Sequence, residues 1–173
     1  MKKWSNLGWN TISWLNFEKR VSFIDAIKKI DWYRVEDHKI FFRNEKVAEI
    51  YKKNDLYKRL LEPNNINYQD IISQKLLPDN AVYVLKKNTV FIIEIKYQHT
   101  EGSVDEKLQT CDFKLKQYKR LLWPLKYDVK YCYVLNRFFM KPKYEDVINY
   151  IQAVGCNVYF RELPLLYLGL PLP

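Results

Sequence analysis

The chain has 173 residues, with 29 Lys and Arg against 20 Asp and Glu, and therefore a formal net charge of +9. An apolar fraction of 48% with only 4 Gly and 7 Pro is typical of one globular domain and excludes disordered and fibrous chains. The apolar runs are far shorter than the roughly 20 residues of a membrane span. Because the first residues also lack the pattern of a secretory signal, we expect a cytoplasmic protein with no membrane partner. The positive charge favours a partner that carries phosphates, with a lysine-rich bystander as the alternative.

The cysteines and histidines do not form a recognisable metal or disulfide pattern. Cys111, Cys132 and Cys156 are an odd number without a CxxC pair, which argues against a disulfide framework and a zinc cage. His38 and His99 are too far apart for a helical metal motif. Any metal ion is therefore expected to be held by oxygen ligands.

The N-terminal third of the chain predicts two helices. The first 35 residues are dense in aromatic side chains, whose spacing is more typical of packing or a subunit interface than of contacts to DNA bases. Residues 18–30 place apolar side chains at helical spacing, with an acidic start and a basic end. Residues 44–62 predict a second helix, which would begin at Asn44 as its N-cap and end before Pro63.

A β-hairpin is predicted after the turn formed by Pro78-Asp79-Asn80. Residues 81–85 and 89–97 have the composition of two strands, joined through Lys87 and Asn88. The second strand opens with the continuous apolar run 90–93. Such a run indicates a strand in the buried middle of a sheet.

The remaining chain alternates helices and strands. Ser103 and Glu106 form a capping-box pattern, and apolar side chains then recur every three or four residues, which predicts one long amphipathic helix from 103 to 122 that Pro124 ends. The elements predicted after it are a strand at 129–135, a helix at 144–154 and a strand at 158–161. The apolar segment 162–173 is expected to pack against the core or a second subunit. This order predicts an α/β fold of the α+β kind with a mixed sheet.

One face of the second hairpin strand carries side chains suited to chemistry. Glu94, Lys96 and Gln98 share that face because strand side chains alternate. Asp79 enters the neighbouring strand, so pairing of the strands would bring its carboxylate beside that of Glu94. Two carboxylates so close repel each other unless a cation lies between them. Mg²⁺ suits such a pair because it prefers one or two carboxylates together with phosphate oxygens.

The pattern Pro78-Asp79 followed by Glu94-Ile95-Lys96 resembles the signature of the PD-(D/E)XK nuclease superfamily. The predicted order of elements resembles the αβββαβ core of that superfamily. Residues 92–122 are similar to a stretch found in small type II restriction endonucleases, in which the catalytic strand runs through a Gly-Ser-Val-Asp-Glu-Lys-Leu turn into the next helix. The alternative interpretation of the short pattern is a turn followed by an exposed strand end.

The resemblance implies a role for each matching position. Asp79, Glu94 and the main-chain carbonyl of Ile95 would bind Mg²⁺, and Lys96 would be the catalytic lysine. Beside these positions, Gln98 continues the same strand face, from which we expect it to bind a phosphate or a water molecule. Many members have a further glutamate on the helix before the core, for which Glu62 and, less well placed, Glu49 are the candidates.

The resemblance also implies how a single nuclease domain would divide residues 1–173. Residues 44–161 would form the catalytic core. Residues 1–43 would be an aromatic-rich helical extension, and residues 162–173 an apolar tail.

Basic residues on the predicted helix 103–122 offer contacts to the DNA backbone. Such contacts add affinity that salt weakens and carry no sequence information. The alternative is a solvated helix face. The candidate DNA-binding residues are Lys107, Lys114, Lys116, Lys119 and Arg120.

The resulting hypothesis is a Mg²⁺-dependent type II restriction endonuclease that hydrolyses double-stranded DNA at a short specific sequence. One active site per chain would require a homodimer to cut both strands, and the family analogy implies a cognate DNA methyltransferase. A structure-selective nuclease, such as a Holliday-junction resolvase or a repair endonuclease, is the alternative enzyme. A DNA-binding module without activity is the alternative outside catalysis.

Overall fold

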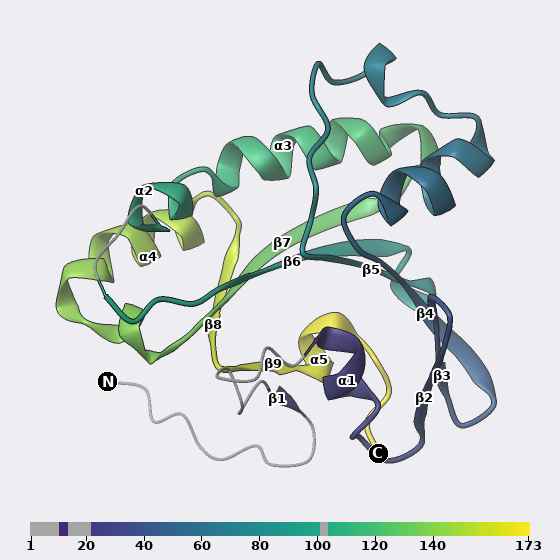
Figure 1. Ribbon diagram of the computed structural model, residues 1–173, viewed down its shortest axis with the longest axis horizontal. Coiled ribbons are helices and arrows are strands. Elements are labelled where there is room, and N and C mark those ends of the chain that lie inside the picture. The colour runs from purple at the N-terminus through teal and green to yellow at the C-terminus, as the bar shows by residue number, and fades with distance from the viewer. Residues whose placement is uncertain (1–10, 14–21, 101–103) are drawn as a thin grey trace.

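The computed structural model describes residues 11–13, 22–100 and 104–173, and its central feature is a mixed seven-stranded sheet (Figure 1). Neighbouring strands from β2 to β6 are antiparallel, whereas β6, β7 and β8 are parallel. A separate antiparallel pair joins β1 (Thr11–Ser13) to β9 (Glu162–Pro164). In order across the large sheet the strands are β2 (Tyr33–Glu36), β3 (Lys39–Phe42), β4 (Glu45–Tyr51), β5 (Asn80–Val84), β6 (Thr89–Lys96), β7 (Asp128–Leu135) and β8 (Asn157–Phe160). The predicted α/β class with a mixed sheet is confirmed at this level.

Helices cover both faces of the sheet (Figure 1). One face packs against α2, α3, α4 and a short π-helix, Leu56–Leu61, which lies between β4 and β5. The opposite face packs against α1 and α5. The α-helices are α1 (Phe23–Ile27), α2 (Val104–Leu108), α3 (Cys111–Leu122), α4 (Glu145–Ala153) and α5 (Leu165–Leu168). Within the described ranges no helix is both long and apolar enough to cross a bilayer.

Strand β6 lies at the centre of the sheet and is buried on both faces. Val90 and Ile92 belong to the core under α3, whereas Phe91 and Ile93 belong to the core under α1 and α5. Burial of each such side chain contributes about 1.5 to 3 kcal/mol to folding. The predicted hairpin and the buried apolar run are thereby confirmed, and β6 stays buried up to Glu94, where its polar end begins.

The helix predicted at 44–62 is wrong over its first half. Residues 45–51 form β4, which pairs with both β3 and β5. Ala48 and Ile50 pack on one face of the sheet and Tyr51 on the other, so the apolar residues that fit a helical stripe also fit a strand. Backbone pairing with β3 and β5 favours the strand over the helix, because tertiary contacts easily override local propensity.

The expected helical extension at the N-terminus is also wrong in part. Helix α1 spans only Phe23–Ile27, with the Ser22 hydroxyl accepting a hydrogen bond from the Asp25 backbone N–H at 3.1 Å as its N-cap. Residues 33–42 form β2 and β3, which extend the large sheet instead of standing apart from it. Residues 28–30 of the predicted helix form a turn, and residues 18–21 lie outside the described residues.

The C-terminal half follows the predicted order closely. The strands at 128–135 and 157–160 and the helix at 145–153 are confirmed, and the tail packs into the core through Leu163, Leu165 and Leu168. The single helix predicted from 103 to 122 is instead two helices, α2 and α3. Thr110 lies at the break, where its hydroxyl donates to the Lys107 carbonyl at 2.8 Å. Ser103 of the predicted capping box lies outside the described residues.

Candidate active site

The sheet brings Asp79 and Glu94 together at one end of β5 and β6. Asn80 pairs with Ile93, so Asp79, which directly precedes β5, is next to Glu94 in the same register. Glu94 has the same parity along β6 as Ile92, whose side chain packs under α3. The hairpin register predicted from the sequence therefore places both carboxylates on the α3 side of the sheet.

Lys96 bridges the two carboxylates. Its Nζ lies 2.7 Å from Glu94 Oε2 and 3.5 Å from Asp79 Oδ2. The Ile95 backbone N–H donates to the same Asp79 oxygen at 3.1 Å, which fixes that carboxylate against β6. The Glu94 side chain is only 6% exposed, whereas those of Lys96 and Asp79 are 21% and 27% exposed. The cluster is thus open to solvent on the side of Asp79 and Lys96.

The charges of the cluster reinforce one another. Burial opposes ionisation of Asp79, but the hydrogen bond from Lys53 and the positive charge of Lys96 hold the pKa of the Asp79 carboxyl below its ordinary value. Burial likewise disfavours the charged form of Lys96, yet Glu94 and Asp79 raise the pKa of its ammonium above the ordinary value. Asp79 and Lys96 are therefore a charged pair at neutral pH.

Lys53 joins the cluster, although no sequence pattern indicates it. Its Nζ donates to Asp79 Oδ1 at 2.5 Å, so each oxygen of that carboxylate has its own lysine neighbour. Lys53 follows β4 by two residues, in a stretch predicted as helical. Only the return of the chain from β4 to β5 brings Lys53 beside Asp79, and no sequence spacing reports that return.

Gln98 lies just beyond the end of β6 and is 7% exposed. Its backbone is fixed by Asn136, whose Nδ2 donates to the Gln98 carbonyl at 2.8 Å and whose Oδ1 accepts from the Gln98 N–H at 3.4 Å. Within the described part of the chain, neither polar atom of the Gln98 side chain has a hydrogen-bond partner. A buried amide without partners costs free energy. A bound ligand or water molecule that formed hydrogen bonds with the Gln98 amide would remove this cost.

Three tyrosines from α3 and β7 pack near the buried carboxylate. Burial, and then the negative charge of Glu94, raise the pKa of the phenols of Tyr118 and Tyr131 well above their ordinary value. Tyr131 and Tyr133 contact each other with ring centroids 5.3 Å apart, and Tyr133 pairs with Glu94 across the parallel strands. These buried aromatic rings lower the local dielectric constant around Glu94, which strengthens the electrostatic interactions of its carboxylate. No sequence pattern marks these tyrosines as part of a site, because an alternating strand and a helical stripe indicate only a core.

The two further glutamate candidates lie apart from the cluster. Glu49 is on strand β4 opposite Tyr83, four residues along β5 from Asp79, or about 13 Å at the usual rise per residue. Its carboxylate pairs with Lys46 at 3.0 Å and accepts a hydrogen bond from Tyr51. The expectation that Glu49 lies on a helix is wrong.

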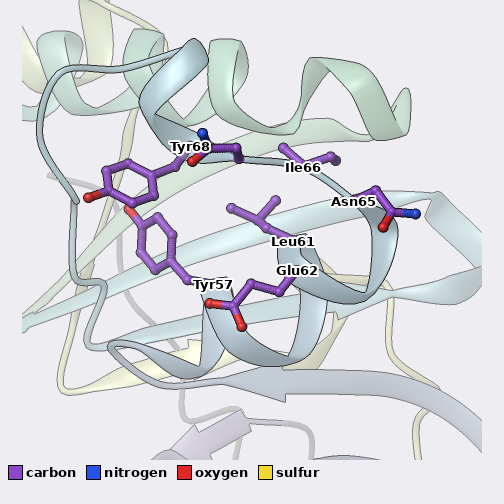
Figure 2. A pocket seen from close by; sticks show the side chains of 7 residues that line it. Tyr57, Leu61, Glu62, Asn65, Ile66 and Tyr68 are labelled. Carbon is purple, nitrogen blue, oxygen red and sulfur yellow. The ribbon is translucent and has the colours of Figure 1, made fainter.

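Glu62 is exposed and follows the π-helix, where it lines a pocket of about 360 Å³ (Figure 2). Tyr57 and Tyr68 form walls of this pocket with ring centroids 5.3 Å apart, and neither Asp79 nor Glu94 lines it. The Tyr57 hydroxyl donates to the Leu76 carbonyl at 2.9 Å and accepts from its N–H at 2.8 Å. The pocket is therefore tied to the segment that leads into Asp79, but Glu62 itself is not part of the carboxylate cluster.

The basic residues predicted to contact DNA lie along α2 and α3, and most are exposed. Lys116 forms an ion pair with Asp112 at 2.7 Å. Arg120 donates to the Ile71 carbonyl at 2.8 Å, which ties the segment before β5 to α3. Lys107 and Lys119 are exposed, and Lys114 is half-buried. Two of the five candidates thus also have structural partners.

The donor set of the cluster fits a hard divalent cation. Within the described ranges, no three side chains of His, Cys, Asp or Glu gather around one point. The candidate ligands are instead two carboxylates, Asp79 and Glu94, with the Ile95 carbonyl. The two carboxylates already converge on one cationic group, the Lys96 ammonium. Such oxygen donors are those that Mg²⁺ prefers, with its remaining positions left to water and substrate phosphate.

Comparisons with protein families, with curated proteins and with solved structures found no match for this chain. The function is therefore argued from the cluster itself.

Proposed function

We propose that the protein is a Mg²⁺-dependent endonuclease of the PD-(D/E)XK kind that hydrolyses phosphodiester bonds of double-stranded DNA, and that it acts as a type II restriction enzyme. The observation that carries the proposal is the convergence of Asp79, Glu94 and Lys96, from the ends of two paired strands, on one half-open position. An acid pair and a lysine held by backbone geometry are suited to phosphoryl chemistry.

Each residue of the chain has a distinct task in this reaction. Asp79, Glu94 and the Ile95 carbonyl would hold Mg²⁺, which when bound polarises the phosphoryl group and acidifies a water molecule. Lys96 would donate hydrogen bonds to the attacking water and to the phosphate oxygen that gains charge. Gln98, whose buried amide has donors and acceptors to spare in the described structure, would orient water or phosphate beside Lys96.

The order of elements around the cluster supports this assignment. Three antiparallel strands, β4, β5 and β6, are followed by α3 and by β7, which is parallel to β6. This is the order expected of the αβββαβ core after its first helix. The net charge of +9 and the exposed lysines of α2 and α3 suit binding to the phosphate backbone.

The proposed partners follow from the number of sites. The described chain has one such cluster, so cutting both strands of a duplex would need two copies, most simply a homodimer on a symmetric sequence. A sequence-specific enzyme of this kind also requires a DNA methyltransferase that protects the host genome. Both partners are part of the proposal.

Cleavage of DNA by the purified protein tests the proposal. With Mg²⁺, plasmid and phage DNA should yield discrete fragments, and sequencing of the fragment ends would give the recognition sequence. Lys96→Ala should abolish cleavage while binding to DNA in Ca²⁺ persists. Lys46→Ala is the matched control, because Lys46 pairs with the single carboxylate of Glu49, and this variant should cut normally.

Two outcomes would contradict the proposal. If the wild-type protein cuts no double-stranded DNA, or if Lys96→Ala cuts as well as the wild type, the assignment of the active site fails. Preferential cutting of a four-way junction over linear duplex would instead assign the protein to the structure-selective nucleases.

A further inference from the structure

We propose that Lys53 is a positioning residue of the active site, which sets the orientation of Asp79 and the net charge of the metal site. The inference rests on the proposed function and extends it to a residue outside the sequence signature. Lys53 Nζ lies 2.5 Å from Asp79 Oδ1, while Asp79 Oδ2 faces the Ile95 N–H at 3.1 Å and Lys96 Nζ at 3.5 Å. The two lysines therefore contact opposite oxygens of one carboxylate.

The backbone around Lys53 is built to hold this contact. Lys53 has a φ of 49°, in the left-handed region that is uncommon for residues other than glycine. Its N–H donates to the Pro78 carbonyl at 2.9 Å, which joins the end of β4 to the residue just before Asp79. The contact between Lys53 and Asp79 is therefore supported by the backbone as well as by the side chains.

The charge balance of the four groups explains what Lys53 does. Asp79 and Glu94 carry two negative charges, and Lys96 and Lys53 carry two positive charges, so the cluster is neutral before a metal ion binds. A divalent cation then makes the site strongly positive. That positive charge suits a phosphodiester, which gains a second negative charge as hydroxide attacks. Without Lys53 the cluster would attract the metal more strongly and the attacked phosphate less strongly.

Lys53 differs from the basic residues of α3 in the contact that it makes. Lys116 is paired with Asp112 of its own helix and Arg120 with the Ile71 carbonyl, and neither partner is a candidate metal ligand. Lys53 contacts a candidate metal ligand directly and its side chain is still 54% exposed. It can therefore respond when a metal ion or a phosphate approaches Asp79.

Substitution of Lys53 by Met, which keeps the length and removes the charge, separates these effects. Ca²⁺ binding, measured by calorimetry without DNA, should become about 3- to 10-fold tighter than in the wild type. At saturating Mg²⁺ the rate of DNA cleavage should fall about 10- to 100-fold. Lys53→Arg should restore both values to within about 3-fold, because it keeps the positive charge.

The opposite signs of the two effects identify a positioning role. General damage to the fold would weaken Ca²⁺ binding and cleavage together, and thermal denaturation of each variant would detect it. Lys58→Met is the matched control, because Lys58 is an exposed lysine five residues further on, and it should leave Ca²⁺ affinity unchanged.

Failure of this inference can be told apart from failure of the proposed function. If Lys53→Met binds Ca²⁺ as the wild type does, or more weakly, the role of Lys53 is overturned even where the wild type cuts DNA. If the wild type binds Ca²⁺, and Lys53→Met binds it more tightly, but neither cuts any DNA, the nuclease function fails while the positioning of Asp79 stands. A wild type that binds no Ca²⁺ overturns both.

Discussion

Two clusters that pair acidic side chains with lysines lie on the same face of the sheet, one around Glu49 and one around Asp79 and Glu94. Only the second resembles an active site. The Glu49 carboxylate on β4 accepts hydrogen bonds from two residues of its own strand, the Lys46 ammonium at 3.0 Å and the Tyr51 hydroxyl. Asp79 and Glu94 belong to two strands and share Lys96, with Lys53 added from a turn. Both clusters pair acids with lysines, so residue type alone does not distinguish them.

The difference lies in how completely the oxygens are satisfied by fixed neighbours. The Glu49 carboxylate has one donor for each oxygen, and both donors come from within three residues of it. In the other cluster two carboxylates face one ammonium, that of Lys96. Two residues further along the chain, the buried amide of Gln98 has no partner among the described residues. A locally satisfied carboxylate stabilises a strand, whereas two converging carboxylates offer a position to a cation.

The largest expected effect tests the distinction directly. Glu94→Gln should reduce Mg²⁺-dependent DNA cleavage by about 10³-fold or more, because an amide is a poor ligand for a hard cation. Glu49→Gln should change the rate by less than about 2-fold. Steady-state cleavage of a plasmid with a mapped site measures both. Comparable losses in the two variants would erase the distinction between the clusters.

A second prediction concerns stability without metal. Lys96→Ala leaves the nearly buried Glu94 beside Asp79 with no bridging ammonium. The metal-free variant should therefore be less stable than the wild type by about 2 kcal/mol. Added Mg²⁺ should recover more stability in this variant than in the wild type, because it supplies the missing positive charge. Urea denaturation with and without Mg²⁺ tests this, and an equal gain in both proteins would argue against a shared cation position.

Tyr51→Phe tests whether the cluster around Glu49 has a structural role only. The substitution removes the phenolic donor to Glu49 and keeps the ring in the core. We expect a loss of about 1 to 2 kcal/mol in the free energy of unfolding, since the hydrogen bond involves a charged acceptor. Cleavage should be unchanged at a temperature where the variant is folded. A large loss of activity in the folded variant would place Glu49 and Tyr51 in the catalytic machinery.

The smallest effect is the pH dependence of the Glu49 cluster. Burial opposes ionisation, but hydrogen bonds from Tyr51 and Lys46 hold the pKa of Glu49 below its ordinary value. A lowered pKa means that the cluster stabilises the fold fully above the unfolded value of about 4.3, and that this contribution is lost as pH falls through the folded value. The difference in unfolding free energy between the wild type and Glu49→Gln should therefore shrink between pH 6 and pH 3. A difference that grows on acidification would contradict the assigned direction.

Local patterns predicted the parts of the fold whose periodicity had one solution. The hairpin of β5 and β6 could be predicted because Pro78-Asp79-Asn80 marks a turn and residues 90–93 are continuously apolar. Helix α3 could be predicted from its stripe of Cys111, Leu115 and Tyr118, which are buried. The helix predicted at 44–62 was wrong over its first half because apolar side chains at this spacing suit a helix as well as a strand that is buried on both faces.

The sequence alone sufficed to place Glu94 and Lys96 on one face of a strand and Asp79 at the entry of the strand beside it, because strand side chains alternate and the hairpin sets the register. The contact between Lys53 and Asp79, and the position of Glu49 and Glu62 outside the cluster, follow from the tertiary fold. These facts depend on where the chain goes between β4 and β5. Long-range placement is fixed by packing of the whole domain, and no local spacing of residues records it.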